Sequence, residues 1–421
     1  MSAVRNGNIQ DEIISLGDQN QRDPLFEVLA KSCQYNVRIA SVDKRSLIDV
    51  HGNKLIDFAS CNYLSFDQEQ DALLPAANAA AREYGVHTSR ARLMGYHELF
   101  SQLERRLADF LGVEDSILFP NTTLAHIGII PALMARGDMI FLDKSAHATM
   151  YQGAQMARDK GAGLVSFRQG DMRTLERQLT EHADARRKMI CVDGVYSMTG
   201  DYAVINELIP LARKHNALLY IDDAHGFGFV GENPTESMPY GFGGNGIVKH
   251  FGGDYDNVMY VAGTAKNLGA AAAVVSVSAK MKEYLLAYAR PLDYTHPSTP
   301  FCLGILDSAL DLQQRTGDAR RKKVYELTRT LVDTLKDEGF SVVNDTYFPI
   351  VSVLAGETNR LIEASRTMYE DGIFLTACPY PTMPKGQEAL RITITSNHEM
   401  DQIEVLLGSL RKVQGLLRSA D

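Results

Sequence analysis

The sequence predicts an α/β protein, with a large, mainly parallel sheet of seven strands and a smaller α+β domain at the carboxyl end. First, seven short apolar runs rich in β-forming residues alternate with helical segments between residues 116 and 278. Such alternation is typical of a parallel sheet covered on both faces. Second, a long helical segment after residue 300 ends the alternation. Third, 421 residues with 45% apolar and 23% charged side chains indicate a globular protein of more than one domain.

The beginning of the chain is expected to form an arm and one helix, over residues 1–55. Residues 1–22 show little apolar periodicity, whereas residues 24–33 fit a short amphipathic helix. Two further helices are expected at 72–85 and 97–112, because each segment ends at a glycine, the residue that most often follows a helix.

The large domain is expected over residues 56–300 and the small domain over residues 301–421. Strands of the large domain are expected at 116–119, 139–142, 164–167, 189–192, 218–221, 258–261 and 272–278. Helices are expected between several of them, at 149–160, 172–183 and 206–215. The small domain is expected to contain a long helix at 302–338, strands at 341–343, 349–355, 372–377 and 390–396, and helices at 358–371 and from about residue 399.

Charge and cysteine content exclude several classes of protein. The net charge of −9 disfavours nucleic acid as the main partner, since phosphate binding favours a basic face. No apolar run approaches the roughly 18 residues of a membrane helix, and the polar amino terminus does not resemble a signal peptide. Five scattered cysteines without a C-x-x-C pair predict neither a metal site nor a disulfide framework, so a cytoplasmic protein is expected.

Polar residues follow the expected strand at 218–221. Asp222, Asp223 and His225 come at its carboxyl end, where ligands bind in open α/β sheets. The glycines of 226–231 form a formal G-x-G-x-x-G, but the breaker-rich residues after them disfavour the helix that a dinucleotide site requires. For this segment alone, solvated carboxylates are the simpler interpretation.

Four more candidates lie near strand ends. His147 and Ser197 follow expected strands, Lys266 lies between two small-residue strands, and Arg391 begins a strand of the small domain. Singly, each has a plain interpretation: a loop lysine, or an arginine in a surface ion pair. Together with Asp222 and His225, three of them (His147, Ser197 and Lys266) form the set that a pyridoxal phosphate site requires, because the lysine forms an imine and the carboxylate keeps the pyridine nitrogen protonated.

Four motifs in the right order resemble those of the α-oxoamine synthases, a family of pyridoxal-phosphate-dependent enzymes. They are HATMYQG, DGVYSMTGD, DDAHGFGFVGEN and PYPTMPKGQEALRITITSNHE. The resemblance extends from about residue 45 to the carboxyl end. It implies the fold type I of pyridoxal-phosphate-dependent transferases, like that of aspartate aminotransferase. It also implies a homodimer with its sites at the subunit interface.

The resemblance also implies roles for residues around the cofactor ring. Asp222 would pair with the pyridine nitrogen, and His225 and Ser197 would hydrogen-bond the phenolic oxygen. His147 would stack on the ring. Lys266 would bind the cofactor through the imine and serve as the proton-transfer base.

Further residues correspond to the phosphate and substrate positions of the family. The phosphate is expected to be held by Thr122, Thr123, Thr264 and Thr295, the last reaching the neighbouring subunit. Arg391 would bind the carboxylate of the substrate amino acid, which suits a bidentate guanidinium. Cys61 replaces the asparagine that assists it in the family, and the adjacent Asn62 is expected to substitute. The family's S-G-[YF]-x-A-N loop is Asn121–His126 in this chain.

The expected reaction is a decarboxylating, Claisen-type condensation. A small amino acid (glycine, alanine or serine) would react with an acyl thioester, on coenzyme A or on a carrier protein, and form an α-amino ketone. Two alternatives remain open. One is another pyridoxal-phosphate reaction on the same fold, such as transamination, lysis or condensation with a non-thioester electrophile. The other is a non-catalytic protein that binds the cofactor.

Overall fold

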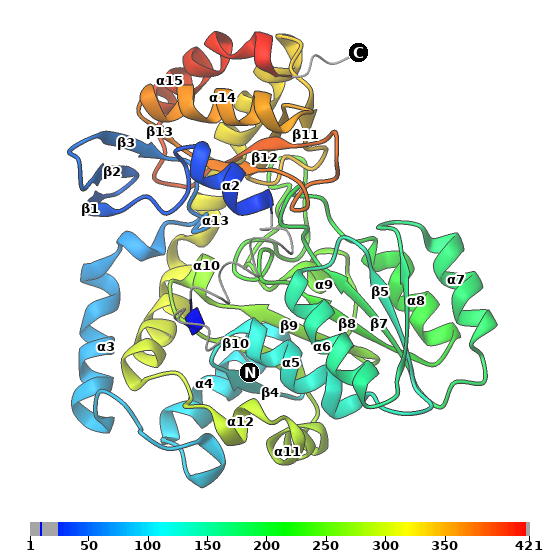
Figure 1. Cartoon of the computed structure of the whole chain (residues 1–421). Coiled ribbons are helices and arrows are strands. Elements are labelled where there is room, and N and C mark those ends of the chain that lie inside the picture. Colours follow the sequence, from blue (N-terminus) through cyan, green and yellow to red (C-terminus); the bar gives the residue numbers. More distant parts are fainter. Residues whose placement is uncertain (1–8, 11–23, 418–421) are drawn as a thin grey trace, which may run out of the picture.

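The computed structural model describes residues 9–10 and 24–417, and its centre is the large sheet that the sequence predicts (Figure 1). The strand order is β4-β10-β9-β8-β7-β5-β6. Only β10 runs opposite to the others, since it pairs antiparallel with both β4 and β9. The strands are β4 (Asp115–Phe119), β5 (Met139–Asp143), β6 (Gly163–Phe167), β7 (Lys188–Asp193), β8 (Ala217–Asp222), β9 (Val258–Gly263) and β10 (Ala273–Val277). The mainly parallel sheet of seven strands is therefore confirmed.

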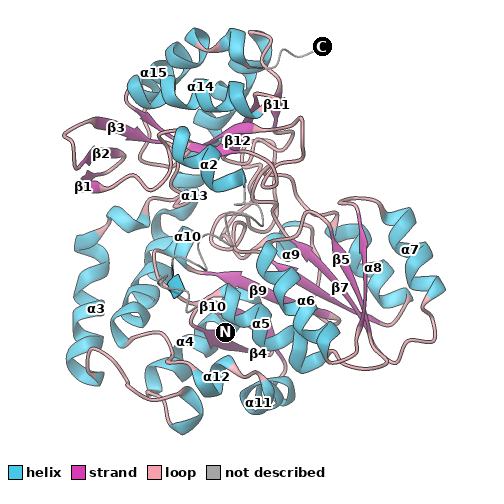
Figure 2. Ribbon diagram, viewed as in Figure 1, coloured by secondary structure: helices cyan, strands magenta, loops and turns pink. Residues whose placement is uncertain are grey.

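Helices cover both faces of this sheet (Figure 2). Alternate residues of β5 show how, because successive side chains of a strand point to opposite faces. Phe141 packs into the cluster that contains Leu179 of α7 (Met172–Glu181), whereas Ile140 packs with Met150 of α6 (Ala148–Asp159). The other covering helices are α4 (Glu98–Leu111), α5 (Thr122–Leu133), α8 (Ile205–Lys214), α9 (Ile247–His250), α11 (Ala279–Tyr288) and α12 (Pro291–Tyr294).

Two smaller sheets lie above the large one in Figure 1. The first has the order β11-β12-β15-β14 and is covered by α14 and α15. The second joins three strands from the amino-terminal part of the chain to one strand from its carboxyl-terminal part, in the order β1-β2-β3-β13. The elements are β1 (Ile39–Asp43), β2 (Ser46–Asp49), β3 (Lys54–Asp57), β11 (Val342–Val343), β12 (Ile350–Leu354), β13 (Ile373–Phe374), β14 (Thr376–Cys378), β15 (Ala389–Thr393), α14 (Thr358–Glu370) and α15 (Met400–Lys412).

Two features of these sheets differ from the expectation. Residues 39–57 form three strands, which the sequence did not indicate because β1 is exposed along its whole length and carries no buried alternation. The single strand expected at 372–377 is divided, since β13 pairs with β3 and β14 pairs with β15. The division of the chain at residues 56 and 300 stays a prediction, and the expected arm lies largely outside the described residues.

The remaining helices connect these layers. They are α2 (Pro24–Lys31), α3 (Gln70–Tyr84), the short α10 (Ala265–Leu268) and the long α13 (Pro300–Asp337). Thr299 caps α13 by accepting a hydrogen bond from the Cys302 amide, and Pro300 occupies its first turn. Across residues 9–10 and 24–417, none of the helices combines the length and apolar character needed to cross a bilayer.

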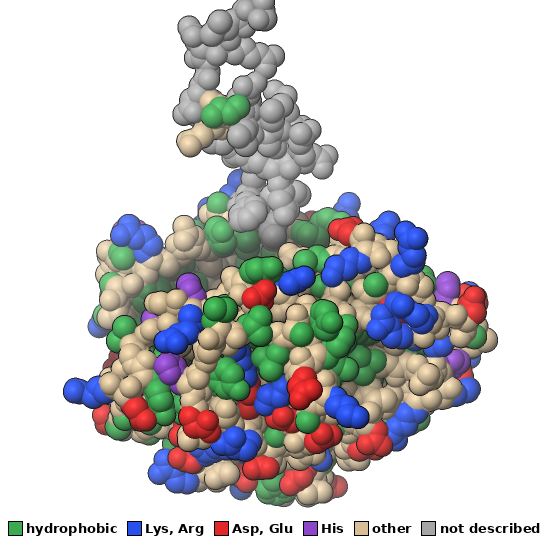
Figure 3. Space-filling view, turned by 90° about the horizontal axis from the view of Figure 1, so that it is seen from below, with side chains coloured by type: hydrophobic (Ala, Val, Ile, Leu, Met, Phe, Trp, Pro, Cys, Tyr) green, Lys and Arg blue, Asp and Glu red, His purple; other side chains and the backbone are tan. Residues whose placement is uncertain are grey.

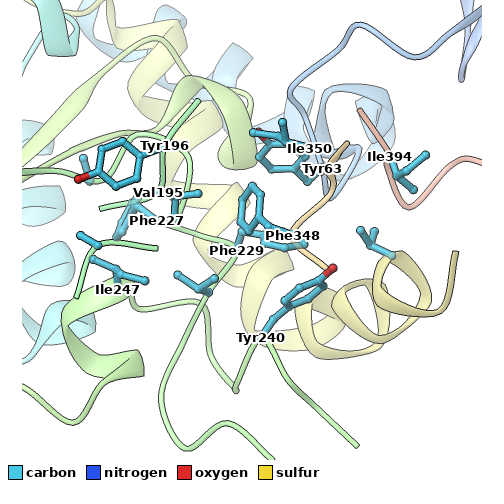
Figure 4. Packing of buried hydrophobic residues seen from close by; sticks show 14 of the residues in the cluster. Tyr63, Val195, Tyr196, Phe227, Phe229, Tyr240, Ile247, Phe348, Ile350 and Ile394 are labelled. Atoms are coloured by element: carbon cyan, nitrogen blue, oxygen red, sulfur yellow. The ribbon is translucent and has the colours of Figure 1, made fainter. Parts of the chain in front are cut away.

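An aromatic cluster joins the amino-terminal segment to the chain that follows β8 and to the residues just before β12 (Figure 4). The rings of Tyr63 and Phe229 lie 5.2 Å apart, and each lies 5.2 Å from the ring of Phe348. Tyr240 completes the group at 4.7 Å from Phe229. Tilted and edge-on contacts of this kind add to the stability that ring burial provides. The cluster fixes the position of Tyr63, which reaches the site described below.

His398 links the carboxyl-terminal segment to β3. Its ring stacks on Phe58 at 4.4 Å, its Nε2 lies 3.0 Å from the Asp57 carbonyl, and its Nδ1 accepts from the Thr395 amide. Burial, assisted by Arg45, lowers the pKa of His398 to about 3. The folded protein therefore holds this imidazole neutral, whereas an unfolded histidine takes up a proton near pH 6.5.

This difference predicts an acid-sensitive fold. Because the unfolded state binds the extra proton, the free energy of unfolding should fall as the pH drops below about 6.5, by about 1 kcal/mol at pH 5.5. Urea unfolding at pH 7.5 and 5.5 measures it. In His398→Asn, which lacks the titrating ring, the change between the two pH values should be smaller by that amount. An equal change in both proteins would contradict the assignment.

Candidate active site

Asp222 is a buried carboxylate at the carboxyl end of β8. Its Oδ2 lies 2.8 Å from His126 Nε2, and its Oδ1 accepts a 3.0 Å hydrogen bond from the Ala224 amide. Burial acts to raise the pKa of Asp222, but His126 and Lys266 outweigh it and hold that pKa below its ordinary value. The carboxylate is therefore ionised at neutral pH and retains lone pairs for a further cationic partner.

Lys266 lies on α10, immediately after β9, and is half-buried. Its charge acts on five surrounding groups, which are Asp222, Asp193, His225, His147 and Cys61. Among the described residues, its amine makes neither a hydrogen bond nor an ion pair. A lysine amine without a partner, beside a buried carboxylate, is available for covalent chemistry.

His225 follows Asp222 by three residues and is held by Tyr63. The Tyr63 hydroxyl lies 2.6 Å from His225 Nδ1. Burial, Lys266 and Arg391 keep the pKa of His225 well below its ordinary value, so the ring is neutral. Burial also raises the pKa of Tyr63 well above its ordinary value, so the phenol keeps its proton. The pair therefore presents a neutral imidazole to the site.

His147 and Ser197 lie in the loops after β5 and β7. His147 caps α6, and its amide donates to Asp193 Oδ1 at 3.0 Å. Burial and the neighbouring Asp222 raise the pKa of Asp193 well above its ordinary value, which favours the protonated form of this carboxyl group. The pKa of His147 is lowered by burial and by Lys266. Asp193 thus fixes the backbone from which the neutral His147 ring projects.

Arg391 brings β15 to this site. Its Nε donates to the Ser197 carbonyl at 2.7 Å, and its NH2 group lies 3.4 Å from Cys61 Sγ. Burial opposes ionisation of Cys61, but Arg391 and Lys266 hold the thiol pKa below its ordinary value. Asn62 is placed differently, because its Oδ1 accepts from the Phe66 amide. The substrate contact expected of Asn62 remains a prediction, and Cys61 is the residue in contact with Arg391.

The threonines expected around the phosphate fall into three groups. Thr122 and Thr123 form the first turn of α5, where backbone N–H groups favour an anion. The hydroxyl of Thr264 lies within hydrogen-bonding distance of the Ala270 and Ala272 carbonyls, so its proton serves the backbone. Thr295 donates to the Pro291 carbonyl at 2.6 Å, beside the exposed Tyr294. The hydroxyl of Thr295 therefore bonds within its own turn, and its expected contact with phosphate remains a prediction.

These residues fit pyridoxal phosphate. The charge of an unpartnered amine acts on both an ionised carboxylate and a neutral histidine, and the N-terminus of α5, which is suited to phosphate, lies close to Gly263 on the same side. Gly263 keeps a gap open there, since a Cβ at this position would come within 3.3 Å of Thr122 Cγ2 and 3.4 Å of Ala224 Cβ. A lysine beside an aspartate, at the carboxyl ends of parallel strands, defines a pyridoxal-phosphate-dependent enzyme of fold type I.

The chain belongs to the aminotransferase class I and II family, whose model matches residues 53–410, and within it to the α-oxoamine synthases. It is 32% identical to 8-amino-7-oxononanoate synthase of Herminiimonas arsenicoxydans over 372 residues, which are 87% of this chain and 92% of that protein. It is 35% identical to the synthase of Saccharophagus degradans over 381 residues, 89% and 92% of the two chains.

A solved structure of a related enzyme has a similar fold. Serine palmitoyltransferase of Sphingomonas wittichii superimposes with a TM-score of 0.83 and 25% identity, over 97% of this chain and 98% of that one. The family, the fold, the enzyme class and the pyridoxal phosphate cofactor that the motifs imply are thereby confirmed.

Two residues of the site were not among those expected from the sequence. His126 contacts Asp222, and Tyr63 contacts His225. Both lie inside segments that were compared with family motifs. A sequence signal therefore existed, because His126 ends the Asn121–His126 loop at the position of the family's asparagine.

Asp223, by contrast, points away from the site and bonds to residues that support the fold. Its Oδ2 accepts from the Tyr260 hydroxyl and the Ile247 amide, and burial raises its pKa to about 7.

The Cys61–Arg391 contact predicts an activated thiol. Iodoacetamide should alkylate Cys61 in the folded apoprotein with a pH midpoint below that of the same residue in urea, because Arg391 and Lys266 favour the thiolate. In Arg391→Met the midpoint should rise. Timed labelling followed by peptide mass spectrometry measures Cys61 separately from the other four cysteines. Identical midpoints in the folded and unfolded protein would contradict the prediction.

Proposed function

We propose that the protein catalyses the decarboxylating condensation of a small L-amino acid with an acyl thioester, giving an α-amino ketone. The observation that carries the proposal is the fixed guanidinium of Arg391, placed beside Cys61 and within range of the charges around His225 and Lys266. It supplies a carboxylate anchor close to the reactive amine. The names of the similar proteins support the reaction, since 8-amino-7-oxononanoate carries its amine on the carbon next to a ketone.

The roles of the residues follow from their positions. When bound, pyridoxal phosphate supplies an electron-accepting ring that stabilises negative charge at the substrate α-carbon. Asp222 would hold the proton on the ring nitrogen, and the neutral His225 and Ser197 would bind the phenolic oxygen. His147 would cover one face of the ring. The amides of Thr122 and Thr123 would hold the phosphate at the N-terminus of α5.

Proton movement belongs to Lys266. Its Nζ takes the proton from the α-carbon of an amino acid whose carboxylate is held by Arg391. The α-carbon then forms a bond to the thioester carbonyl carbon, and the thiol leaves. Loss of the carboxylate as CO2 leaves an electron pair at the α-carbon, and Lys266 returns a proton there. Thiol and CO2 are therefore released in equal amounts.

The test has two stages. The first is an absorbance titration of the cofactor-loaded enzyme with glycine, alanine and serine, in which one amino acid should shift the visible band. Lys266→Ala should lose the native band. The second stage supplies acyl-coenzyme A and, separately, an acyl carrier protein, and follows free thiol and CO2. Lys266→Ala should slow turnover by about 100- to 10,000-fold, as expected for loss of a general base.

The matched control is Arg391→Lys. It should leave the native band unchanged. It should weaken binding of the amino acid by about 10- to 100-fold, because a bidentate partner of the substrate carboxylate is lost. Amino acid turnover without thiol release would point to another pyridoxal-phosphate reaction. Amino acid binding without exchange of the α-proton in D2O would point to a non-catalytic protein. Either result overturns the proposal.

We also propose that two copies of the chain form the functional unit. Segments 86–96 and α11–α12 lie at the bottom of Figure 1, and hydrophobic side chains gather on that face in Figure 3. Val86, Met94 and Tyr294 are 79%, 77% and 73% exposed. Large exposed apolar side chains that gather in this way are typical of an interface. Thr295 beside Tyr294 would then serve the partner's phosphate. We also propose that the protein is cytoplasmic.

Light scattering coupled to size exclusion tests the dimer. The unaltered protein should elute as a dimer at micromolar concentration, and Met94→Asp combined with Tyr294→Asp should shift it to the monomer, since two charges would be buried. Val405→Asp is the matched control, because Val405 is 49% exposed on α15. A monomer in the unaltered protein, or an unchanged dimer in the double variant, would contradict the proposal.

A further inference from the structure

We propose that His126, together with Tyr220 behind it, is a positioning residue that keeps Asp222 ionised and aimed at the pyridine nitrogen of the cofactor. The inference rests on the proposed contact between Asp222 and that nitrogen. It goes further by assigning a function to a pair of side chains that do not themselves touch the cofactor or the substrate.

The three side chains form one continuous buried row. His126 is fully buried in the second turn of α5, and Tyr220 is fully buried in β8. His126 Nδ1 lies 2.9 Å from the Tyr220 hydroxyl, and its Nε2 lies 2.8 Å from Asp222 Oδ2. Tyr220 and Asp222 are two residues apart on one strand, so their side chains leave the same face of the sheet. A single imidazole can therefore bridge them.

The chemistry of the ends determines the direction of the hydrogen bonds. An ionised carboxylate can only accept, so Nε2 of His126 must carry a hydrogen. Burial raises the pKa of Tyr220 well above its ordinary value, so the phenol keeps its proton and can donate a hydrogen bond to Nδ1. Tyr220 thus orients His126, whose Nε2 donates to Asp222. Both bonds favour the charged form of the carboxylate.

The helix that carries His126 is itself held firmly. The His126 carbonyl lies only 2.6 Å from where a Cβ on Gly153 would be, so α6 can approach α5 this closely only because that residue is glycine. The same α5 begins at Thr122 and Thr123, the proposed phosphate site. One rigid helix therefore sets the positions of both the phosphate amides and the partner of Asp222, which is how a preorganised site is built.

A purely structural role makes a different prediction. If the row only satisfied buried polar groups, changes in it would alter stability and would affect every ligand of the site alike. If it acts through Asp222, changes should affect only a ligand with a basic ring nitrogen. 1-Deazapyridoxal 5′-phosphate, in which carbon replaces that nitrogen, separates the two.

The experiment measures the dissociation constants of pyridoxal 5′-phosphate and the deaza analogue for the apoprotein by absorbance and fluorescence titration. Four proteins are compared, which are the unaltered chain, His126→Leu, His126→Gln and Tyr220→Phe. His126→Leu removes the donor to Asp222. His126→Gln places an amide N–H near the original Nε2. Tyr220→Phe deletes only the far hydroxyl. Thermal unfolding of each apoprotein records stability separately.

For the natural cofactor, His126→Leu should weaken binding by about 10- to 100-fold, as with other residues that orient a ligand-binding group. Tyr220→Phe should weaken it by about fivefold, the equivalent of one neutral hydrogen bond. His126→Gln should restore most of the loss. Affinity for the deaza analogue should change by less than about twofold in all variants.

Each result decides a separate question. Equal losses for both ligands would overturn the inference and leave a structural role. Unchanged affinity for both would also overturn it. No preference of the unaltered protein for the natural cofactor would instead refute the Asp222 contact on which the inference rests. If His126→Leu does not fold, the ratio of the two affinities in Tyr220→Phe and His126→Gln still decides, because both substitutions preserve side-chain volume.

Discussion

The structure depends on one energetic constraint, which is the burial of an ionised carboxylate at the end of a parallel strand. An isolated charge there would be costly, so the fold must surround Asp222 with compensating groups. It does so from three elements: the helix α5, which supplies His126, the turn after β8, which supplies the Ala224 amide, and the short helix α10, which supplies the charge of Lys266. The parallel sheet makes this possible because β7, β8 and β9 end at one edge.

A second constraint closes the other side of the site. Arg391 and Cys61 come from distant parts of the chain and meet because the amino-terminal segment lies on the small domain. The pairing of β3 with β13 and the His398 contact to Asp57 hold that segment in place. The position of Arg391, the proposed carboxylate anchor, therefore depends on how β15 packs against the amino-terminal segment.

Much of this could be predicted from the chain, since all seven strands of the large sheet are short apolar runs and several of the helices between them are amphipathic. Asp222, His225 and Lys266 are predicted site residues because they follow such strands. The strands of residues 39–57 could not be found, because β1 buries no side chain and its pairing is decided by distant partners. His126 lies in a segment that matches a family motif, but its contact with Asp222 joins residues 96 positions apart and becomes visible only in the folded chain.

The sequence by itself therefore determines which polar residues follow each strand and in what order, because strand ends and their polar neighbours are local features. What required the folded molecule is the set of pairings: Cys61 rather than Asn62 beside Arg391, Tyr63 against His225, and Tyr220 behind His126. These contacts join residues up to 330 positions apart. No local propensity encodes such a distance, and only the packing of three sheets brings the groups within hydrogen-bonding range.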